Sequence, residues 1–155
     1  MTYFKTLKAP TLDRSLGTLA SPSSISVNER MECSNITHSN LSVNTDGQLV
    51  LDSGYTFVLS ASAYQEQSGT SASIVTYAWY DVTNSVELGR DLQIVTKTGT
   101  VSSGLRGCLA RCVIETTAQI TVEFRITAIN GAPDNINNTV LFDYLGTPWY
   151  SVLSF

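Results

Sequence analysis

The sequence predicts an all-β fold, an antiparallel two-sheet sandwich that follows an extended N-terminal arm. Apolar and polar residues alternate with a period of two in several short runs, which is typical of strands with one buried face. Turn signals separate about nine or ten such runs at intervals of about 8–12 residues, and no run has a convincing helical period. Charged residues make up only 14% of the 155 residues, so the polar surface depends on Ser, Thr, Asn and Gln, which favour strands and turns.

The predicted sandwich is organised around two strands between Gly54 and Gly89. The first spans residues 55–64, and its apolar residues alternate with smaller or polar ones. The second spans residues 74–82 and has apolar residues on both faces, with Val75, Tyr77 and Trp79 on one and Tyr80 on the other. Burial of both faces is expected for a central strand. The polar residues 65–71 between the two strands predict a loop.

Shorter elements are predicted on both sides of this pair. Before it, Asp46-Gly47 predicts a hairpin turn, because Asp-Gly supplies the positive φ that such turns need. A second turn is predicted at Asp52-Ser53-Gly54. The remaining predicted strands lie within residues 25–43 and at 48–51, 92–98, 108–115, 120–126, 139–145 and 149–155.

Residues 1–30 are predicted to form an arm and linker, followed by a β-sandwich domain over residues 31–155. Residues 1–30 contain scattered apolar residues without a strand or helix period, and Pro10 and Pro22 interrupt them. Such a segment cannot form a core by itself, so we expect it to lie along a neighbouring surface. The arm has a net charge of +2 and the remainder a net charge of −6. An acidic body argues against nucleic acid as a partner, because phosphate binding depends on basic residues.

The sequence also argues against a membrane protein and against a disulfide framework. No run approaches the roughly 18 apolar residues of a membrane helix, and the N-terminus lacks the apolar core of a signal peptide. Cys33, Cys108 and Cys112 are an odd number, and we expect all three to be reduced, with Cys108 and Cys112 as small buried residues. Synthesis in a reducing cytoplasm is therefore expected.

No group of residues in the sequence predicts catalysis, a metal site or a cofactor. The single histidine, His38, is expected at an exposed turn rather than in a catalytic triad. Four acidic residues sit beside turn glycines and asparagines, where carboxylates usually cap turns: Asp81, Glu87, Asp91 and Asp134. We therefore expect a protein that is not an enzyme.

Two runs resemble a known family. The first, Asp46-Gly-Gln-Leu-Val-Leu-Asp-Ser-Gly-Tyr-Thr-Phe-Val-Leu-Ser-Ala-Ser-Ala, resembles the C1q/TNF-like jelly roll in its turn, apolar strand and Gly-Tyr step. The second, Tyr77-Ala-Trp-Tyr-Asp-Val-Thr-Asn-Ser-Val-Glu-Leu-Gly, is similar to a run in virion proteins of tailed bacteriophages with this fold. The resemblance implies a homotrimer whose aromatic and aliphatic residues pack around a threefold axis.

The aromatic residues support an expectation of self-association. The chain has 14 of them (2 Trp, 7 Tyr and 5 Phe), and one strand carries them on both faces. A small sandwich has one inner face, so a second aromatic face implies a partner or an exposed patch. The residues expected at the trimer interface are Tyr77, Trp79, Tyr80, Trp149 and Tyr150.

The expected function is that of a trimeric capsid decoration (cement) protein on the surface of a phage virion. The major capsid protein is the expected partner, and the arm is expected to bind it. The residues expected to make this contact are Tyr3, Phe4, Lys5, Leu7, Lys8, Leu12, Arg14 and Leu16. An alternative remains open, the receptor- or glycan-binding head of a tail fibre, in which weak contacts made three at a time give avidity. A polysaccharide-degrading enzyme is a third alternative.

Overall fold

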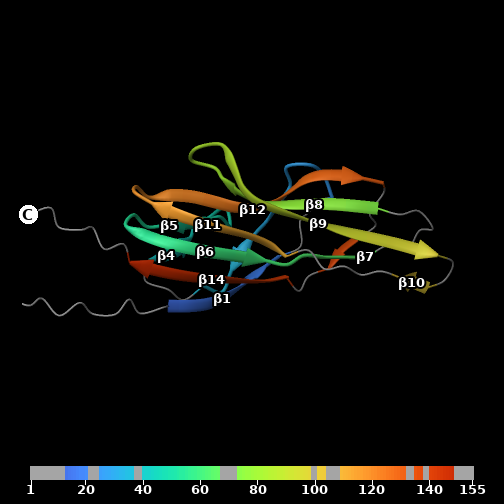
Figure 1. Ribbon diagram of the computed structural model, residues 1–155, viewed down its shortest axis with the longest axis horizontal. Helices are drawn as coiled ribbons and strands as arrows, with labels where there is room; N and C mark the ends of the chain where they lie inside the picture. Colours follow the sequence, from blue (N-terminus) through green and yellow to red (C-terminus); the bar gives the residue numbers. More distant parts are fainter. Residues whose placement is uncertain are drawn as a thin grey trace, which may run out of the picture.

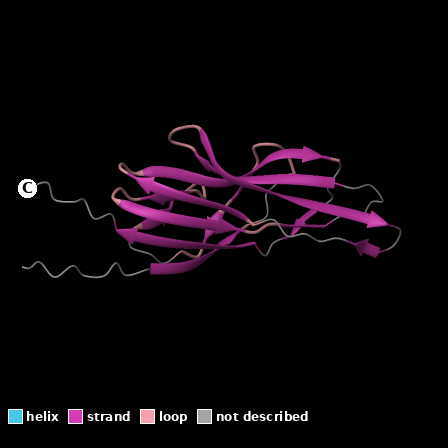
Figure 2. Cartoon of the chain, in the orientation of Figure 1, coloured by secondary structure: helices cyan, strands magenta, loops and turns pink. Residues whose placement is uncertain are grey.

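The computed structural model confirms the all-β fold class. It describes the backbone of residues 13–20, 25–36, 40–66, 73–98, 101–103, 109–131, 135–137 and 140–148. Side chains are described for residues 17–20, 25–36, 40–63, 73–92 and 109–131. Within this part of the chain the regular elements are strands, joined by loops and turns (Figure 2).

The strands form two stacked antiparallel sheets (Figure 1). The five-stranded sheet has the order β11 (Ala110–Thr116), β6 (Tyr55–Ala61), β14 (Val140–Pro148), β1 (Asp13–Leu19) and β3 (Cys33–Ser34). The seven-stranded sheet has the order β10 (Val101–Ser103), β9 (Val86–Thr98), β8 (Ser73–Asp81), β12 (Ile120–Asn130), β5 (Leu49–Leu51) and β4 (Leu41–Val43), and β2 (Arg30–Met31) also pairs with β12. A separate pair joins β7 (Tyr64–Glu66) to β13 (Asn135–Asn137).

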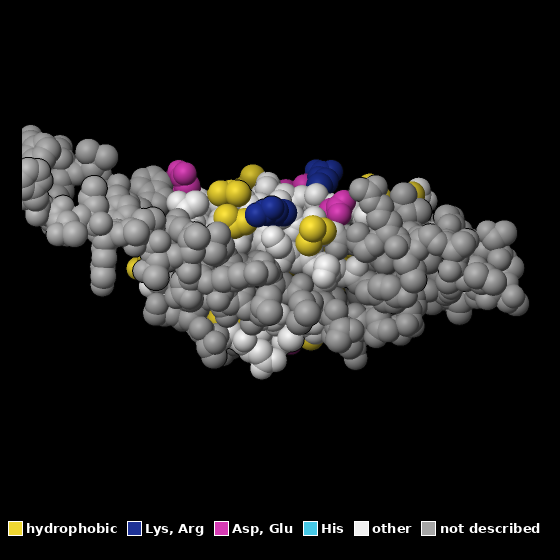
Figure 3. Space-filling model, turned by 60° about the horizontal axis from the view of Figure 1, so that its bottom comes forward, with side chains coloured by type: hydrophobic (Ala, Val, Ile, Leu, Met, Phe, Trp, Pro, Cys, Tyr) yellow, Lys and Arg dark blue, Asp and Glu magenta, His cyan; other side chains and the backbone are white. Residues whose placement is uncertain are grey.

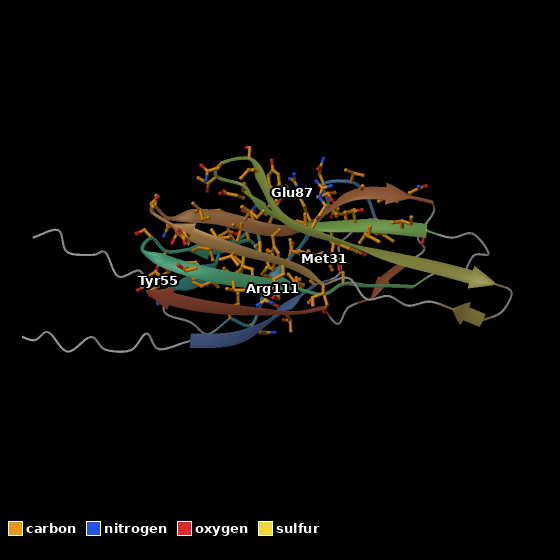
Figure 4. All side chains as sticks on the ribbon, viewed as in Figure 1. Met31, Tyr55, Glu87 and Arg111 are labelled. Carbon is orange, nitrogen blue, oxygen red and sulfur yellow. The ribbon has the colours of Figure 1, made fainter. Side chains whose placement is uncertain are left out.

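The predicted alternation decides which side chains enter the core. Along β11, buried and exposed residues alternate without a break, and along β6 the inward residues Phe57, Leu59 and Ala61 are fully buried. The predicted turns are also present, with Gly47 and Gly54 at φ values of +71° and +85°. Met31 points between the sheets, whereas Glu87 lies on the outer side of the seven-stranded sheet (Figure 4).

The centre of the core is aromatic. The Trp79 ring lies 5.2 Å from the Phe124 ring, and Tyr77 stacks on Phe124 at 5.8 Å. The indole Nε1 of Trp79 donates a hydrogen bond to the carbonyl oxygen of Ala110, 3.3 Å away on the other sheet. This bond satisfies a buried polar group and links the two sheets at the same point.

The predicted N-terminal arm over residues 1–30 needs a correction, because residues 13–19 within it form a strand of the sandwich. β1 pairs with β14 along its whole length, from Asp13 opposite Gly146 to Leu19 opposite Val140, and its end also pairs with β3. Leu19 is 1% exposed within the core. The strand escaped prediction because Gly17 and Leu19, its two buried residues with described side chains, include only one large apolar group. Residues 1–12 lie outside the described part of the chain.

A second difference from the prediction is that β9 is longer than expected. It begins at Val86 rather than at residue 92, and a bulge shifts its register with β8 between Trp79 and Tyr80. Gly89 lies against β11, where an added Cβ would sit 2.3 Å from the carbonyl oxygen of Arg111. Gly89 therefore permits a close backbone contact between the sheets.

Candidate interaction surfaces

The outer side of the five-stranded sheet exposes large apolar side chains, and we call it the apolar face. It consists of Val58 on β6 together with Leu109 and Val113 at β11. Leu109 is 60% exposed and Val113 is 65% exposed, the highest values among the large hydrophobic residues that are described. Arg111 and Glu115 of the same strand are exposed on this side as well. The space-filling view shows hydrophobic side chains lying beside charged ones (Figure 3).

The apolar face extends across the sheet through the strand register. Val113 pairs with Val58, and Val58 pairs on its other side with Leu145 of β14. Three consecutive strands therefore place an aliphatic residue at the same register position. Exposed β-branched residues in such a row are suited to packing against another sheet, since each one buried contributes about 1.5–3 kcal/mol.

The outer side of the seven-stranded sheet carries a network of polar side chains, and we call it the polar face. The guanidinium carbon of Arg125 lies 3.3 Å from the centre of the Tyr80 ring, which is a cation–π contact. Nη1 of Arg125 is 3.4 Å from Oε1 of Glu123, and Gln48 donates from Nε2 to Oε2 of Glu123 at 2.7 Å. Glu123 is only 8% exposed, so its charge is compensated by partners rather than by water.

Further arginines on this side are also paired with acids. Ala78 faces Arg90 on one side and Arg125 on the other, and Arg125 faces Arg30. Arg90 pairs with Glu87, and Arg30 lies 3.8 Å from Asp46. Since each of these three arginines has a carboxylate partner, the row is a set of ion pairs and not an anion-binding site.

Two residues expected at the trimer interface are core residues, which corrects that expectation. Tyr77 and Trp79 are both 0% exposed in a single chain and pack on Phe124, so neither side chain can touch a partner. Tyr80 is on the outer side as expected, but Arg125 covers its ring. Trp149 and Tyr150 lie outside the described residues.

The residues expected to bind a capsid are only partly described. Arg14 and Leu16 are in β1, paired with Leu145 and Asp143, and their side chains are not described. The others lie outside the described part: Tyr3, Phe4, Lys5, Leu7, Lys8 and Leu12. Because Asp13 pairs with Gly146 and β14 ends at Pro148, the described chain begins and ends side by side at one end of the five-stranded sheet (Figure 1).

The thiols that are described are buried and free. Cys112 is 5% exposed, and burial raises the pKa of its thiol to about 12. Cys33 is 4% exposed, and burial, with a smaller effect of the Glu123 charge, raises the pKa of its thiol even more strongly. A thiol held in its protonated form is a poor nucleophile, so neither is suited to catalysis. Cys108 lies outside the described residues.

The acidic residues considered in the sequence have structural contacts where they are described. Asp81 accepts hydrogen bonds from the backbone N and the side-chain Nδ2 of Asn84, which caps the β8–β9 turn as predicted. Asp91 accepts a 2.7 Å hydrogen bond from the backbone N of Leu109. Within the described ranges, no three His, Cys, Asp or Glu residues gather as metal ligands, and no helix has the length and apolar character to span a membrane. His38 and Asp134 lie outside these ranges.

Sequence reasoning missed the main residues of both faces. Glu123 and Arg125 alternate with Val122, Phe124 and Ile126, so their position on the outer side was available from the pattern. Nothing in the pattern showed that they contact Tyr80 on β8. Val113 gave a clearer signal, since it is a valine on the otherwise charged side of an alternating strand.

Comparison with known proteins identifies the fold. No protein-family model matches the sequence, and no curated protein matches it. Among solved structures, the chain is similar to Eiger TNF from S. frugiperda, with a TM-score of 0.58 and 11% identity over 92% of this chain and 98% of that chain. Murine APRIL aligns with a TM-score of 0.46 and 10% identity over 86% of this chain and 98% of that chain. The likeness to Eiger shows a TNF-like jelly roll.

Proposed function

We propose that this protein is a non-enzymatic structural protein that assembles as a homotrimer through its apolar face. The exposure of Val113 and Leu109, at 65% and 60%, is the observation that carries the proposal. On the polar face Tyr80, Glu123 and Arg125 are already paired within one chain, whereas Leu109 and Val113 on the five-stranded sheet are the most exposed large hydrophobic residues among those described. Burial against other copies removes that apolar area from water.

The proposed number of three chains rests on the resemblance of the sequence to the C1q/TNF-like jelly roll. In such an arrangement each copy presents the same sheet to an axis, which suits a face built from one row of aliphatic residues. Val58 and Val113 then pack against neighbouring copies, and Arg111 lies beside them as a charged group that sets the register between subunits.

As the biological role, we propose decoration of a phage capsid, with synthesis in the host cytoplasm. The low charged content of 14% supports a protein whose surface is largely covered in an assembly. Contact with the major capsid protein is assigned to residues 1–12, which immediately precede Asp13, the first residue of β1 in the five-stranded sheet. Tyr3, Phe4, Lys5, Leu7, Lys8 and Leu12 are the proposed contact residues.

Light scattering coupled to size exclusion tests the assembly. We expect a mass near 50 kDa, three times the chain mass of 16.8 kDa. Replacing Leu109 and Val113 together by Ser should give the mass of one chain with an unchanged fold, because both side chains are exposed. The control is Val27→Ser, which removes a 50% exposed valine from the loop before β2 and should leave the mass unchanged. A single-chain mass for the unaltered protein at micromolar concentration contradicts the proposal.

Co-sedimentation with bare capsids tests the proposed role. A chain that lacks residues 1–12 keeps every described strand, so we expect it to retain the trimer mass and to lose binding to capsids. Binding at the level of the full chain would contradict the assignment of capsid contact to this segment.

A second candidate function is the receptor- or glycan-binding head of a tail fibre. It is favoured by a pocket at one end of the sandwich whose lining is rich in hydroxyl and amide groups.

A further inference from the structure

A pocket of about 410 Å³ opens between the β8–β9 turn, the β11–β12 turn and the edge of β11. Its volume is within the range of about 300–1,000 Å³ that small-molecule sites occupy. The lining residues all have described side chains, and the polar ones are Asp81, Thr83, Asn84, Glu115, Thr116, Thr117 and Gln119. The apolar part of the lining includes Leu88, Val113 and Ile120.

Hydrogen bonds hold the walls of the pocket in place without a ligand. The backbone N of Thr121 donates to Oγ1 of Thr83 at 2.9 Å, and the backbone N of Val82 donates to the carbonyl oxygen of Thr121 at 2.8 Å. These two bonds fix the β8–β9 turn against the start of β12. On the other side, the hydroxyl of Thr116 donates to the carbonyl oxygen of Asp52 at 2.6 Å. The pocket is therefore preformed.

The polar groups that remain free are mainly hydrogen-bond acceptors and hydroxyls. Both carboxylate oxygens of Asp81 already accept bonds from Asn84, and Asp81 is 4% exposed. The side chain of Glu115, by contrast, is exposed and has no hydrogen bond or ion pair with any described residue, and the same is true of the Thr117 side chain. Gln119 uses Nε2 for Asp52, at 3.2 Å, and keeps its amide oxygen free.

This set of groups excludes two classes of ligand. The lining contains no Lys, Arg or His, so phosphate and carboxylate ligands have no positive partner and face the charges of Asp81 and Glu115. A metal cation needs several free oxygen ligands, and only Glu115 offers an uncommitted carboxylate. A neutral ligand with many hydroxyl groups fits both the acceptors and the aliphatic part of the lining.

We infer that this pocket binds a neutral saccharide of one or two rings. The Glu115 carboxylate accepts hydrogen bonds from two neighbouring sugar hydroxyls, and Thr117 and the Gln119 amide oxygen contact further hydroxyls. The C–H face of the ring lies against Leu88 and Ile120. The saccharide site does not depend on the trimer proposal, although Val113 and Glu115, both on the outer side of β11, border the pocket and the apolar face.

Backbone amide chemical shifts measured during sugar titrations test the inference. The probes are D-glucose, D-galactose, N-acetyl-D-glucosamine and lactose at up to about 50 mM, which exceeds the millimolar Kd expected for a few hydrogen bonds. Putrescine and calcium chloride serve as cationic probes and glycerol as a control for unspecific hydroxyl binding. We expect at least one sugar to shift the amides of residues 83–84 and 115–120 in a saturable way, and the other probes to leave them in place.

Two variants and a matched control locate the binding. Glu115→Gln keeps the shape of the side chain but removes its charge, and it should weaken sugar binding by about tenfold, the usual effect of losing a charged hydrogen-bond partner. Thr117→Val removes one hydroxyl at nearly constant volume and should weaken binding by less. Glu32→Gln makes the same charge change at an exposed position between β2 and β3 and should leave binding unchanged.

Three results would overturn the saccharide site. They are saturable shifts with putrescine or calcium in place of sugar, shifts spread over both sheets, or equal sugar affinity in Glu115→Gln and the unaltered protein. If the protein is a trimer but binds no sugar, the saccharide site is contradicted and the assembly proposal stands. If the protein is a single chain that binds sugar, the assembly proposal is contradicted and the saccharide site stands.

Discussion

The outer sides of the two sheets cover the same core, but they differ in whether their outward side chains are paired within the chain. On the polar face, Tyr80, Glu123 and Arg125 contact one another, and Gln48 completes the set. On the apolar face, Val113 is 65% exposed on β11 and pairs with Val58 on β6. A surface whose side chains are already paired gains little from a partner, whereas an exposed aliphatic row gains the burial of its whole area. The difference teaches that side-chain pairing within one chain, rather than strand composition, decides which outer side is left with exposed apolar groups.

The largest expected effect comes from removing β1, which breaks the five-stranded sheet beneath the apolar face. Deleting residues 1–24 removes every pairing of β1 with β14 and β3 and the buried side chain of Leu19. Losing one buried leucine alone costs about 2–5 kcal/mol, so we expect the melting temperature to fall by about 10 °C or more, measured by circular dichroism. The seven-stranded sheet loses no strand in this variant.

A shorter deletion is the control for this prediction. Removing residues 1–12 leaves β1 and all other described strands intact, so its melting temperature should stay within a few degrees of that of the full chain. If the deletion of residues 1–24 also melted within a few degrees, β1 would not be a structural strand and the arm interpretation would stand.

An intermediate effect is expected on the polar face, and it should change stability without changing assembly. Arg125→Ala leaves Glu123, which is 8% exposed, without its cation, so we expect the free energy of unfolding in urea to fall by about 1–3 kcal/mol. The mass by light scattering should be that of the unaltered protein. Arg90→Ala is the matched control, because Arg90 is 67% exposed and an exposed ion pair contributes at most about 1 kcal/mol. A shift of Arg125→Ala to the mass of one chain would contradict the distinction between the faces.

The smallest effect concerns Cys112, which lies on the inner side of β11 next to the exposed Val113. Its folded-state pKa of about 12 is above the ordinary value of 9.0, so the folded state keeps a proton that the unfolded state releases at alkaline pH. The stabilisation is complete below about pH 9 and is lost as pH rises from there towards 12. Between pH 8 and 9.5 we expect less than about 1 kcal/mol of loss from this thiol. Urea unfolding of Cys112→Ala should show a shallower alkaline decline, and an equal decline would contradict this assignment.

The strands with strong alternation were predictable, because their pattern directly reflects which residues are buried. β8 and β11 follow the predicted ranges within two residues, β6 and β12 begin at the predicted residues but end three residues earlier and four residues later than predicted, and the Asp46-Gly47 turn was predicted from its need for positive φ. β1 was not predictable from its pattern, since its sequence DRSLGTL has a glycine at one of its buried positions. The pair β7–β13 was missed for a similar reason, because Tyr64–Glu66 and Asn135–Asn137 are mostly polar.

The candidate site was less predictable than the fold, because a pattern with a period of two does not say which face turns inward. On β8 both faces carry aromatic residues, so Tyr77 and Trp79 could be assigned to either the core or an interface. The register with Phe124 on β12 decides that they enter the core. The Tyr80–Arg125 contact and the pocket beside Glu115 depend on residues about 30–45 positions apart, and no local signal connects such residues.

The pairing of β1 with β14 also sets the order in which the chain can fold during synthesis. Leu19 cannot meet Val140 until Val140 itself has left the ribosome. At about 5–20 residues per second, the 121 positions between them (140 minus 19) correspond to a wait of roughly 6–24 s. Closure between such distant segments also makes folding slow relative to locally connected folds. During that interval β1 and the open edge of β6 lack their central partner, so the nascent chain is most vulnerable to misassembly with its neighbours just before the strand that completes the sheet is made.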